Sequence, residues 1–242
     1  MSDSTQTLQQ ATQVHEGGDW VQAARMYSQI IETNPNHPEA LHRFGILCQQ
    51  IGKHSDAREM LTRAIANTVR GQSADYRVTL AISYLAEGRA AEALAECELA
   101  RAESESPTMY LVQGRAFRQL NDREQAKACL VSGVEKYPCD VTLQFELGQT
   151  HFELDQWNDA TSCFEQVLEL DGKHSQAILR LTEMMLSEEI EIGDPWINRL
   201  RLALTYSNDE SMRNELRRKL ADCHSVRGES DHADAVCRQI RP

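Results

Sequence analysis

The sequence has 242 residues, of which 41% are apolar and 6% aromatic, and its formal net charge is −12. Such an acidic chain, without any Lys/Arg-rich block, is unsuited to nucleic acid, whose phosphates are bound by basic side chains. No apolar run of about 18 residues could span a membrane and MSDSTQTLQQ is no export signal, so we expect a cytoplasmic protein without membrane insertion.

A small residue recurs along the chain at steps of 34, 36, 33 and 34 residues. It stands at Ala11, Gly45, Ala81, Gly114 and Gly148. Twelve residues later the chain has Ala23, Ala57, Ala93, Ala126 and Ala160. Four residues further on it has Tyr27, Leu61, Cys97, Leu130 and Phe164. Breaks rich in Gly, Asn and Asp separate the small residue from the alanine, which predicts a helix, a turn and a second helix in each repeat.

In chain order the predicted repeats span residues 4–37, 38–73, 74–106, 107–140 and 141–174. Two divergent repeats follow. In 175–210, Thr182 replaces the small residue, SEEIEIGD lengthens the turn, and Trp196 stands near the expected alanine. In 211–242, the last helix has one apolar face and is expected to form a C-terminal cap. Because no stretch alternates with period two, we predict an all-α solenoid of about seven helix-turn-helix repeats, a single array over 1–242.

Glycine in a helix interior costs about 1 kcal/mol relative to alanine. A neighbouring group must therefore explain why position 45 is a glycine. We expect the small residues on both helices of a repeat to let the helices approach closely. On this view Gly45 contacts Ala57 and Gly148 contacts Ala160, while larger apolar side chains interlock one turn away. Asp194, directly before Pro195, is expected to cap the helix that follows it.

The pattern resembles the tetratricopeptide repeat family, whose signature has a leucine, a glycine and an aromatic residue on the first helix and alanines on the second. The clearest copy, LGQTHFELDQWNDATSCFEQVLELDG, carries Leu147, Gly148, Trp157, Ala160 and Phe164. The resemblance covers residues 4–174 in five copies. It implies that first helices line a concave face, second helices a convex one, and that the concave face binds proteins.

The phase of the first helices predicts which side chains face this groove. They are His42, Arg43, Ile46, Gln49, Val78, Ile82, Leu111, Arg115, Arg118, Phe145, Gln149, Phe152, Leu179 and Arg180. Apolar strips with a few polar groups hold extended peptides or helices, and arginine suits carboxylate groups. We therefore expect a protein or peptide ligand with apolar and acidic groups. The alternative is that the strip is buried between first helices and that the arginines are solvated.

Two specificities known in the family do not carry over to this chain. One uses lysine and asparagine on the first helices to clamp a C-terminal carboxylate, and no such set is present here. The other uses a ladder of asparagines. At those phases this chain has Gln9, Arg43, Thr79, Val112, Glu146 and Arg180.

The sequence contains no motif of enzyme chemistry: neither a phosphate-binding loop, nor G-x-S-x-G, nor H-E-x-x-H. Cys223, His224, His232 and Cys237 are close in sequence, but their spacing fits no common zinc pattern, so we expect core residues and no metal or cofactor. The seven cysteines, without a C-x-x-C pair, fit reduced thiols. The three tryptophans are expected to be packing wedges.

The leading interpretation is a non-enzymatic adaptor or scaffold that binds a peptide or partner helix in its groove. A second interpretation is a substrate-presenting module of a bacterial sulfotransferase or glycosyltransferase, because HPEALHRFGILCQQIGKHSDA looks like the repeats that precede such domains. A third is self-association through the thin apolar face of Leu8, Ala11 and Val14.

Overall fold

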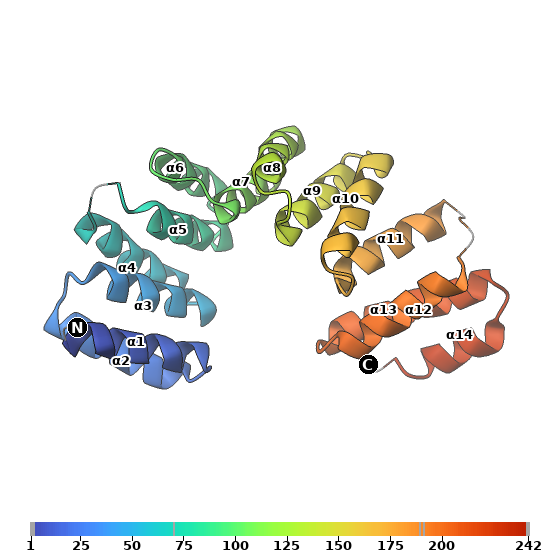
Figure 1. Ribbon diagram of the computed structural model, residues 1–242, viewed down its shortest axis with the longest axis horizontal. Helices are drawn as coiled ribbons and strands as arrows, with labels where there is room; N and C mark the ends of the chain where they lie inside the picture. The colour runs from blue at the N-terminus through green and yellow to red at the C-terminus, as the bar shows by residue number, and fades with distance from the viewer. Residues whose placement is uncertain (1–2, 70, 189, 191, 241–242) are drawn as a thin grey trace. The chain divides into compact units, whose positions relative to one another are not determined.

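The computed structural model describes residues 3–69, 71–188, 190 and 192–240. Within these ranges the regular structure consists of helices, without strands, as Figure 1 shows. The helices are α1 (Asp3–Glu16), α2 (Trp20–Thr33), α3 (Pro38–Gln50), α4 (His54–Asn67), α5 (Ala74–Ala86), α6 (Ala90–Arg101), α7 (Pro107–Gln119), α8 (Arg123–Lys136), α9 (Val141–Glu153), α10 (Trp157–Leu170), α11 (Ser175–Ser187), α12 (Asp194–Tyr206), α13 (Glu210–Val226) and α14 (Ser230–Cys237). The prediction of an all-α helical repeat is confirmed.

The chain divides into two compact units, Met1–Gly133 and Val134–Pro242, with the boundary inside α8. We call them the N-terminal and the C-terminal unit and describe each by itself. The single array over 1–242 stays a prediction. Residues 189 and 191 of the expected long turn, and residues 241–242 of the expected cap, lie outside the described ranges.

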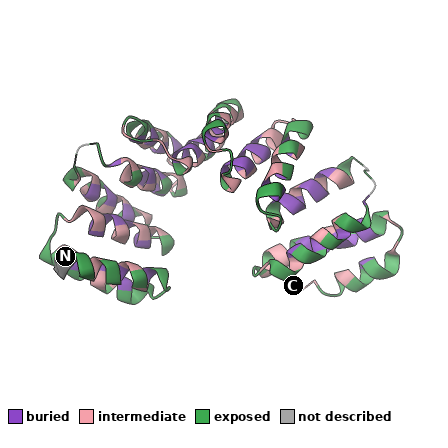
Figure 2. Ribbon diagram, viewed as in Figure 1, coloured by how far each residue is buried: buried purple, intermediate pink, exposed green. Residues whose placement is uncertain are grey.

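Within both units each helix packs closely on the next one in sequence, and first helices of successive pairs also touch. In the N-terminal unit, α1 packs on α3, α3 on α5 and α5 on α7; in the C-terminal unit, α11 packs on α13. Figure 2 shows the buried faces turned toward these neighbours. Such side-by-side first helices leave one face of each for other contacts.

Three glycines explain how closely the two helices of a pair approach. A Cβ atom built on Gly45 would lie 2.8 Å from Leu61 Cγ, one on Gly114 would lie 2.7 Å from Leu130 Cγ, and one on Gly148 would lie 2.8 Å from Phe164 Cε1. The expectation that Gly45 and Gly148 accommodate the alanines of the second helix is therefore wrong in its main contact. The glycine makes room for the larger residue that stands four positions after the alanine of the second helix. The Ala57 carbonyl oxygen would also lie 3.4 Å from a Cβ on Gly45.

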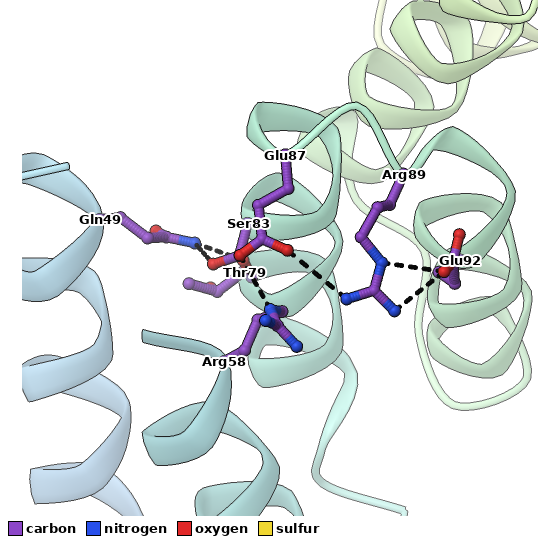
Figure 3. Close-up of polar contacts among 7 residues, drawn as sticks. All are labelled: Gln49, Arg58, Thr79, Ser83, Glu87, Arg89 and Glu92. Carbon is purple, nitrogen blue, oxygen red and sulfur yellow. Dashed lines mark hydrogen bonds and ion pairs between the residues drawn. The ribbon is translucent and has the colours of Figure 1, made fainter. Parts of the chain in front are cut away.

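Polar side chains join successive helix pairs in the N-terminal unit, as Figure 3 shows. From α3, Gln49 Nε2 donates hydrogen bonds to the Thr79 carbonyl oxygen at 2.6 Å and to Ser83 Oγ at 2.7 Å on α5. From α4, Arg58 Nε pairs with Glu87 Oε1 at 2.9 Å. These bonds fix one pair on the next by donor and acceptor geometry as well as by apolar burial.

The divergent pair α11 and α12 is held by a hydroxyl in place of a small residue. Thr182 is fully buried, donates to the Ile178 carbonyl oxygen at 2.6 Å and accepts a hydrogen bond from Trp196 Nε1 at 2.9 Å. Asp194 is the first residue of α12 instead of its cap, and its carboxylate pairs with Arg227 Nη1 at 2.7 Å.

Candidate functional site: two surfaces on first helices

The predicted groove residues are distributed over both units. His42, Arg43, Ile46, Gln49, Val78, Ile82, Leu111, Arg115 and Arg118 belong to the N-terminal unit, and Phe145, Gln149, Phe152, Leu179 and Arg180 to the C-terminal unit. Each unit contains a hollow lined by several of these residues, and the two hollows differ in chemistry.

In the C-terminal unit, helices α9, α11 and α13 enclose a cavity of about 120 Å³, which we call the C-terminal pocket. Its lining residues are Phe145, Gln149, Gln176, Leu179, Arg180, Glu183, Met212, Glu215 and Lys219. The Phe145 ring packs against two other rings, with its centre 5.6 Å from that of Phe164 and 4.9 Å from that of His174. The structure thus brings four predicted residues of α9 and α11 together and adds α13.

The charges of the C-terminal pocket are only partly paired. Arg180 Nη1 pairs with Glu183 at 2.9 Å, and its guanidinium lies 5.5 Å from the centre of the Phe152 ring. Lys219 forms no ion pair among the residues that the structure describes. The side-chain oxygen Oε1 of Gln149 is buried without a hydrogen-bond partner in this part of the chain. Glu215, in the same lining, likewise forms no ion pair among the described residues. A cation, a carboxylate and an amide oxygen are therefore left for a ligand.

Sequence reasoning missed the contribution of α13, although a signal was present. Lys219 stands two residues before Ala221, as Arg43 stands two residues before Gly45 and Arg180 two before Thr182. The same phase, continued into the last repeat, would have placed Lys219 on the groove side.

In the N-terminal unit, a groove runs between α1 and α3. Two adjoining hollows of about 400 and 460 Å³ share Thr12 and Arg43 in their lining. We call them together the N-terminal groove, lined by Leu8, Gln9, Thr12, Gln13, His15, Glu16, Gly18, Trp20, Glu39, Arg43, Ile46 and Gln50. Only Arg43 and Ile46 were predicted.

Arg43, at the middle of the N-terminal groove, is already engaged. Its Nε donates to Glu39 Oε1 at 2.7 Å, and the Tyr76 hydroxyl donates to Glu39 Oε2 at 3.0 Å. Burial alone would raise the pKa of Glu39, but the bonds from Arg43 and Tyr76 outweigh it and hold this pKa below its usual value. The charge of Arg43 is thus largely neutralised within the groove.

Other predicted groove residues lie in packing positions. His42 is 8% exposed, packs against Tyr76 with tilted rings whose centres are 4.3 Å apart, and forms a hydrogen bond with Thr79 Oγ1 at 3.0 Å. Burial lowers the pKa of His42 to about 4, so the ring is neutral at pH 7. Val78 is 5% exposed, whereas Ile82 is 38% exposed. The alternative of a buried strip therefore describes His42 and Val78.

The remaining predicted side chains lie nearer the surface. Leu111 and Arg118 are half-buried on α7, and Arg115 is exposed there. In the C-terminal unit, Phe152 is half-buried and meets the Trp157 ring edge to face at 5.1 Å.

Of the three residues expected to form a self-association face, only Leu8 and Val14 remain partly exposed, and self-association stays a prediction. Ala11 is fully buried in a cluster with Tyr27, and Leu8 and Val14 pack against the same cluster. Trp20 is not a wedge: it is 46% exposed and lines the N-terminal groove.

Of the cysteines and histidines near the C-terminus, His224 and His232 lie side by side, with stacked rings whose centres are 5.4 Å apart. In the described residues no group of three or more His, Cys, Asp or Glu side chains gathers around a common point. His224 is buried and its Nδ1 bonds to Glu229 Oε2 at 2.5 Å, in agreement with a packing role. Cys237, expected in the core, is exposed.

Comparison with known proteins adds to this geometry. Two family models described as tetratricopeptide repeat match residues 15–77 and 141–174. No curated protein matches the sequence. No helix in the described part of the chain is both long enough and apolar enough to cross a bilayer.

Solved structures share the fold at low sequence identity. PilW, a type IV pilus biogenesis factor, is 18% identical over 90% of this chain and 98% of its own, with a TM-score of 0.76. PilF of Pseudomonas aeruginosa is 15% identical over 88% and 96%, with a TM-score of 0.71. The C-terminal part of a TPR repeat-containing protein of Cytophaga hutchinsonii is 14% identical over 97% and 95%, with a TM-score of 0.70. The chain thus carries tetratricopeptide repeats at residues 15–77 and 141–174 and shares the helical-repeat fold of these solved structures.

Proposed function

We propose that the chain is a non-catalytic protein-interaction scaffold that holds a peptide segment or helix of a partner against its first helices. Tetratricopeptide repeat proteins generally bind protein partners. The observation that carries the proposal is the C-terminal pocket. There three helices contribute three apolar side chains, a lysine without an ion pair among the described residues, and a buried amide oxygen without a hydrogen-bond partner.

The size of the C-terminal pocket favours a side chain over a whole small molecule. Small-molecule sites usually measure about 300–1,000 Å³, well above the 120 Å³ found here. A cavity of this size suits one apolar anchor of a longer segment that continues over the surface. Phe145, Leu179 and Met212 supply the apolar lining for such an anchor.

The polar groups around the pocket indicate what flanks the anchor. Lys219 and Glu215 both lack an ion-pair partner among the described residues, but Glu215 is exposed to solvent, whereas Lys219 is half-buried. The less solvated cation favours an acidic side chain of the partner. Gln149 Oε1 is buried and unpaired, and it would accept a backbone N–H of the bound segment. We therefore propose a ligand with an apolar anchor next to an acidic group.

The test selects displayed random peptides on the immobilised chain and measures the affinity of the enriched sequences. Since a charge-assisted hydrogen bond contributes about 1.5–3 kcal/mol, Lys219→Glu should weaken binding at least tenfold. Arg218→Glu is the matched control, because Arg218 is the adjacent exposed cation on α13 and lies outside the pocket. Enriched peptides without acidic groups, or equal effects of both substitutions, would refute the proposed site.

A further inference from the structure

The N-terminal groove has the opposite charge preference. Glu39 and Arg43 neutralise each other at 2.7 Å, so this pair offers a ligand little net charge. Glu16 is exposed and forms no ion pair among the described residues. Both ring nitrogens of His15 are hydrogen-bonded, to Tyr27 Oη at 3.3 Å and to Gln50 Oε1 at 2.7 Å. Arg43 lines the same hollow and feels the charge of Glu16, but its ion pair is with Glu39. The three groups together therefore leave one net negative charge, and Glu16 is the carboxylate without an ion pair.

An exposed aromatic ring lines the same hollow as this carboxylate. Trp20, the first residue of α2, is 46% exposed and borders the hollow together with Glu16 and Ile46. It contacts no aromatic ring and no cation among the residues that the structure describes, unlike Trp157 and Trp196. Tryptophan is the aromatic side chain best suited to hold a cation against its face.

From this juxtaposition we propose that the N-terminal groove binds a basic segment of a protein partner, with one arginine side chain in the hollow of Trp20 and Glu16. The planar guanidinium stacks on the indole and forms paired hydrogen bonds with the carboxylate, which a lysine ammonium cannot do equally well. Ile46 contacts the aliphatic stem of the arginine. The hollow of about 400 Å³ has room for this side chain together with the backbone that carries it.

The charge of the whole chain supports the same occupant. The net charge of −12 attracts cationic segments at long range, which raises the rate of encounter with a basic partner. This inference shares with the proposed function only the premise that the ligand is a protein segment. It concerns other residues, another unit and the opposite charge.

The experiment uses the full chain labelled with 5-fluorotryptophan, whose Trp20 resonance is assigned with Trp20→Phe. The probes are three matched synthetic peptides in which leucine alternates with arginine, with its uncharged isostere citrulline, or with glutamate. The arginine peptide should shift the Trp20 resonance saturably, and the citrulline and glutamate peptides should bind at least tenfold more weakly. Binding of the arginine peptide should also weaken as salt is raised from about 50 to about 500 mM, by screening.

Paired variants separate this site from general attraction to an acidic protein. Glu16→Gln should weaken the arginine peptide about fivefold, whereas Glu32→Gln, an exposed carboxylate on α2 outside the groove, should leave the affinity unchanged. An unmoved Trp20 resonance, or equal effects of the two substitutions, would overturn the inference. Lys219→Glu should not affect the Trp20 shift, so the two proposals fail independently.

Discussion

Replacing Gly45 by alanine tests how the helices of a pair approach each other. The new Cβ would lie 2.8 Å from Leu61 Cγ and 3.0 Å from Leu61 Cδ2, whereas carbon atoms prefer about 3.5–4.0 Å. Leu61 is fully buried, so it has little space into which to retreat. The substitution therefore forces either the side chain or the helix to move.

Two opposing terms set the expected magnitude. Overpacking a well-filled core costs about 1–3 kcal/mol, while replacing a helical glycine by alanine gains about 1 kcal/mol. We expect Gly45→Ala to lower the free energy of unfolding by about 1 kcal/mol. Leu61→Ala alone should cost about 2–5 kcal/mol because it leaves a cavity.

The decisive quantity is the coupling between the two changes. In the double variant the methyl group introduced at position 45 no longer meets a leucine side chain and partly fills the cavity, so we expect a favourable coupling of about 1–3 kcal/mol. Urea unfolding monitored at the fluorinated Trp20 reports on the N-terminal unit. Gly172→Ala, followed at the fluorinated Trp157 of its own unit, is the control, because a Cβ there would meet only the Leu168 carbonyl oxygen, at 3.6 Å, and stability should not fall.

Additive effects of Gly45→Ala and Leu61→Ala, within about 0.5 kcal/mol, would refute this account of the glycine. So would a clear stabilisation by Gly45→Ala in the presence of Leu61, since it would mean that the helix-propensity term alone decides.

Three further predictions follow from burial and hydrogen bonding. The pKa of His42 is lowered to about 4 in the folded state and is near 6.5 in the unfolded state, so the unfolded state binds more protons between these values. The free energy of unfolding should therefore fall as the pH drops from about 6.5 toward about 5. Urea unfolding at each pH measures this fall, which should be less steep in His42→Gln. Ellman's reagent at about pH 8 should label the exposed thiols of Cys139 and Cys237 rapidly, the half-buried Cys129 and Cys163 more slowly, and the three buried thiols only after unfolding. Rapid labelling of all seven would contradict the packing. Thr182→Val should lower the melting temperature more than Thr182→Ser, because only valine leaves the indole N–H of the half-buried Trp196 without its acceptor. Equal losses would show that the hydroxyl contributes nothing.

The fold could be predicted from the sequence because the helical period and the small residues recur in phase over five copies. The exact partner of each glycine could not. Gly45 and Ala57 are both small, which suggests a contact between them, but the volume that a missing Cβ leaves is filled by the largest nearby group, Leu61. Periodicity shows which faces meet but does not give the depth to which each side chain reaches.

The candidate sites were only partly predictable for a related reason. Phase places Phe145 and Arg180 on the groove side, and both line the C-terminal pocket. The same phase cannot show that Arg43 is neutralised by Glu39 one turn earlier, or that Gln49 is bound to α5. Whether a groove-side group is available to a ligand depends on its neighbours in three dimensions.

The bonds between α3–α4 and α5–α6 limit how this protein can be rearranged. Gln49 reaches two acceptors on α5, and Arg58 requires a carboxylate at Glu87. A helix pair moved to another place in the series would meet different side chains at both positions and leave these donors unmatched. Although the repeats share a common pattern, the contacts between successive helix pairs therefore depend on the order of the repeats. In versions of the chain with the repeats shuffled, the helix pairs should pack poorly on one another even though every individual pair is intact.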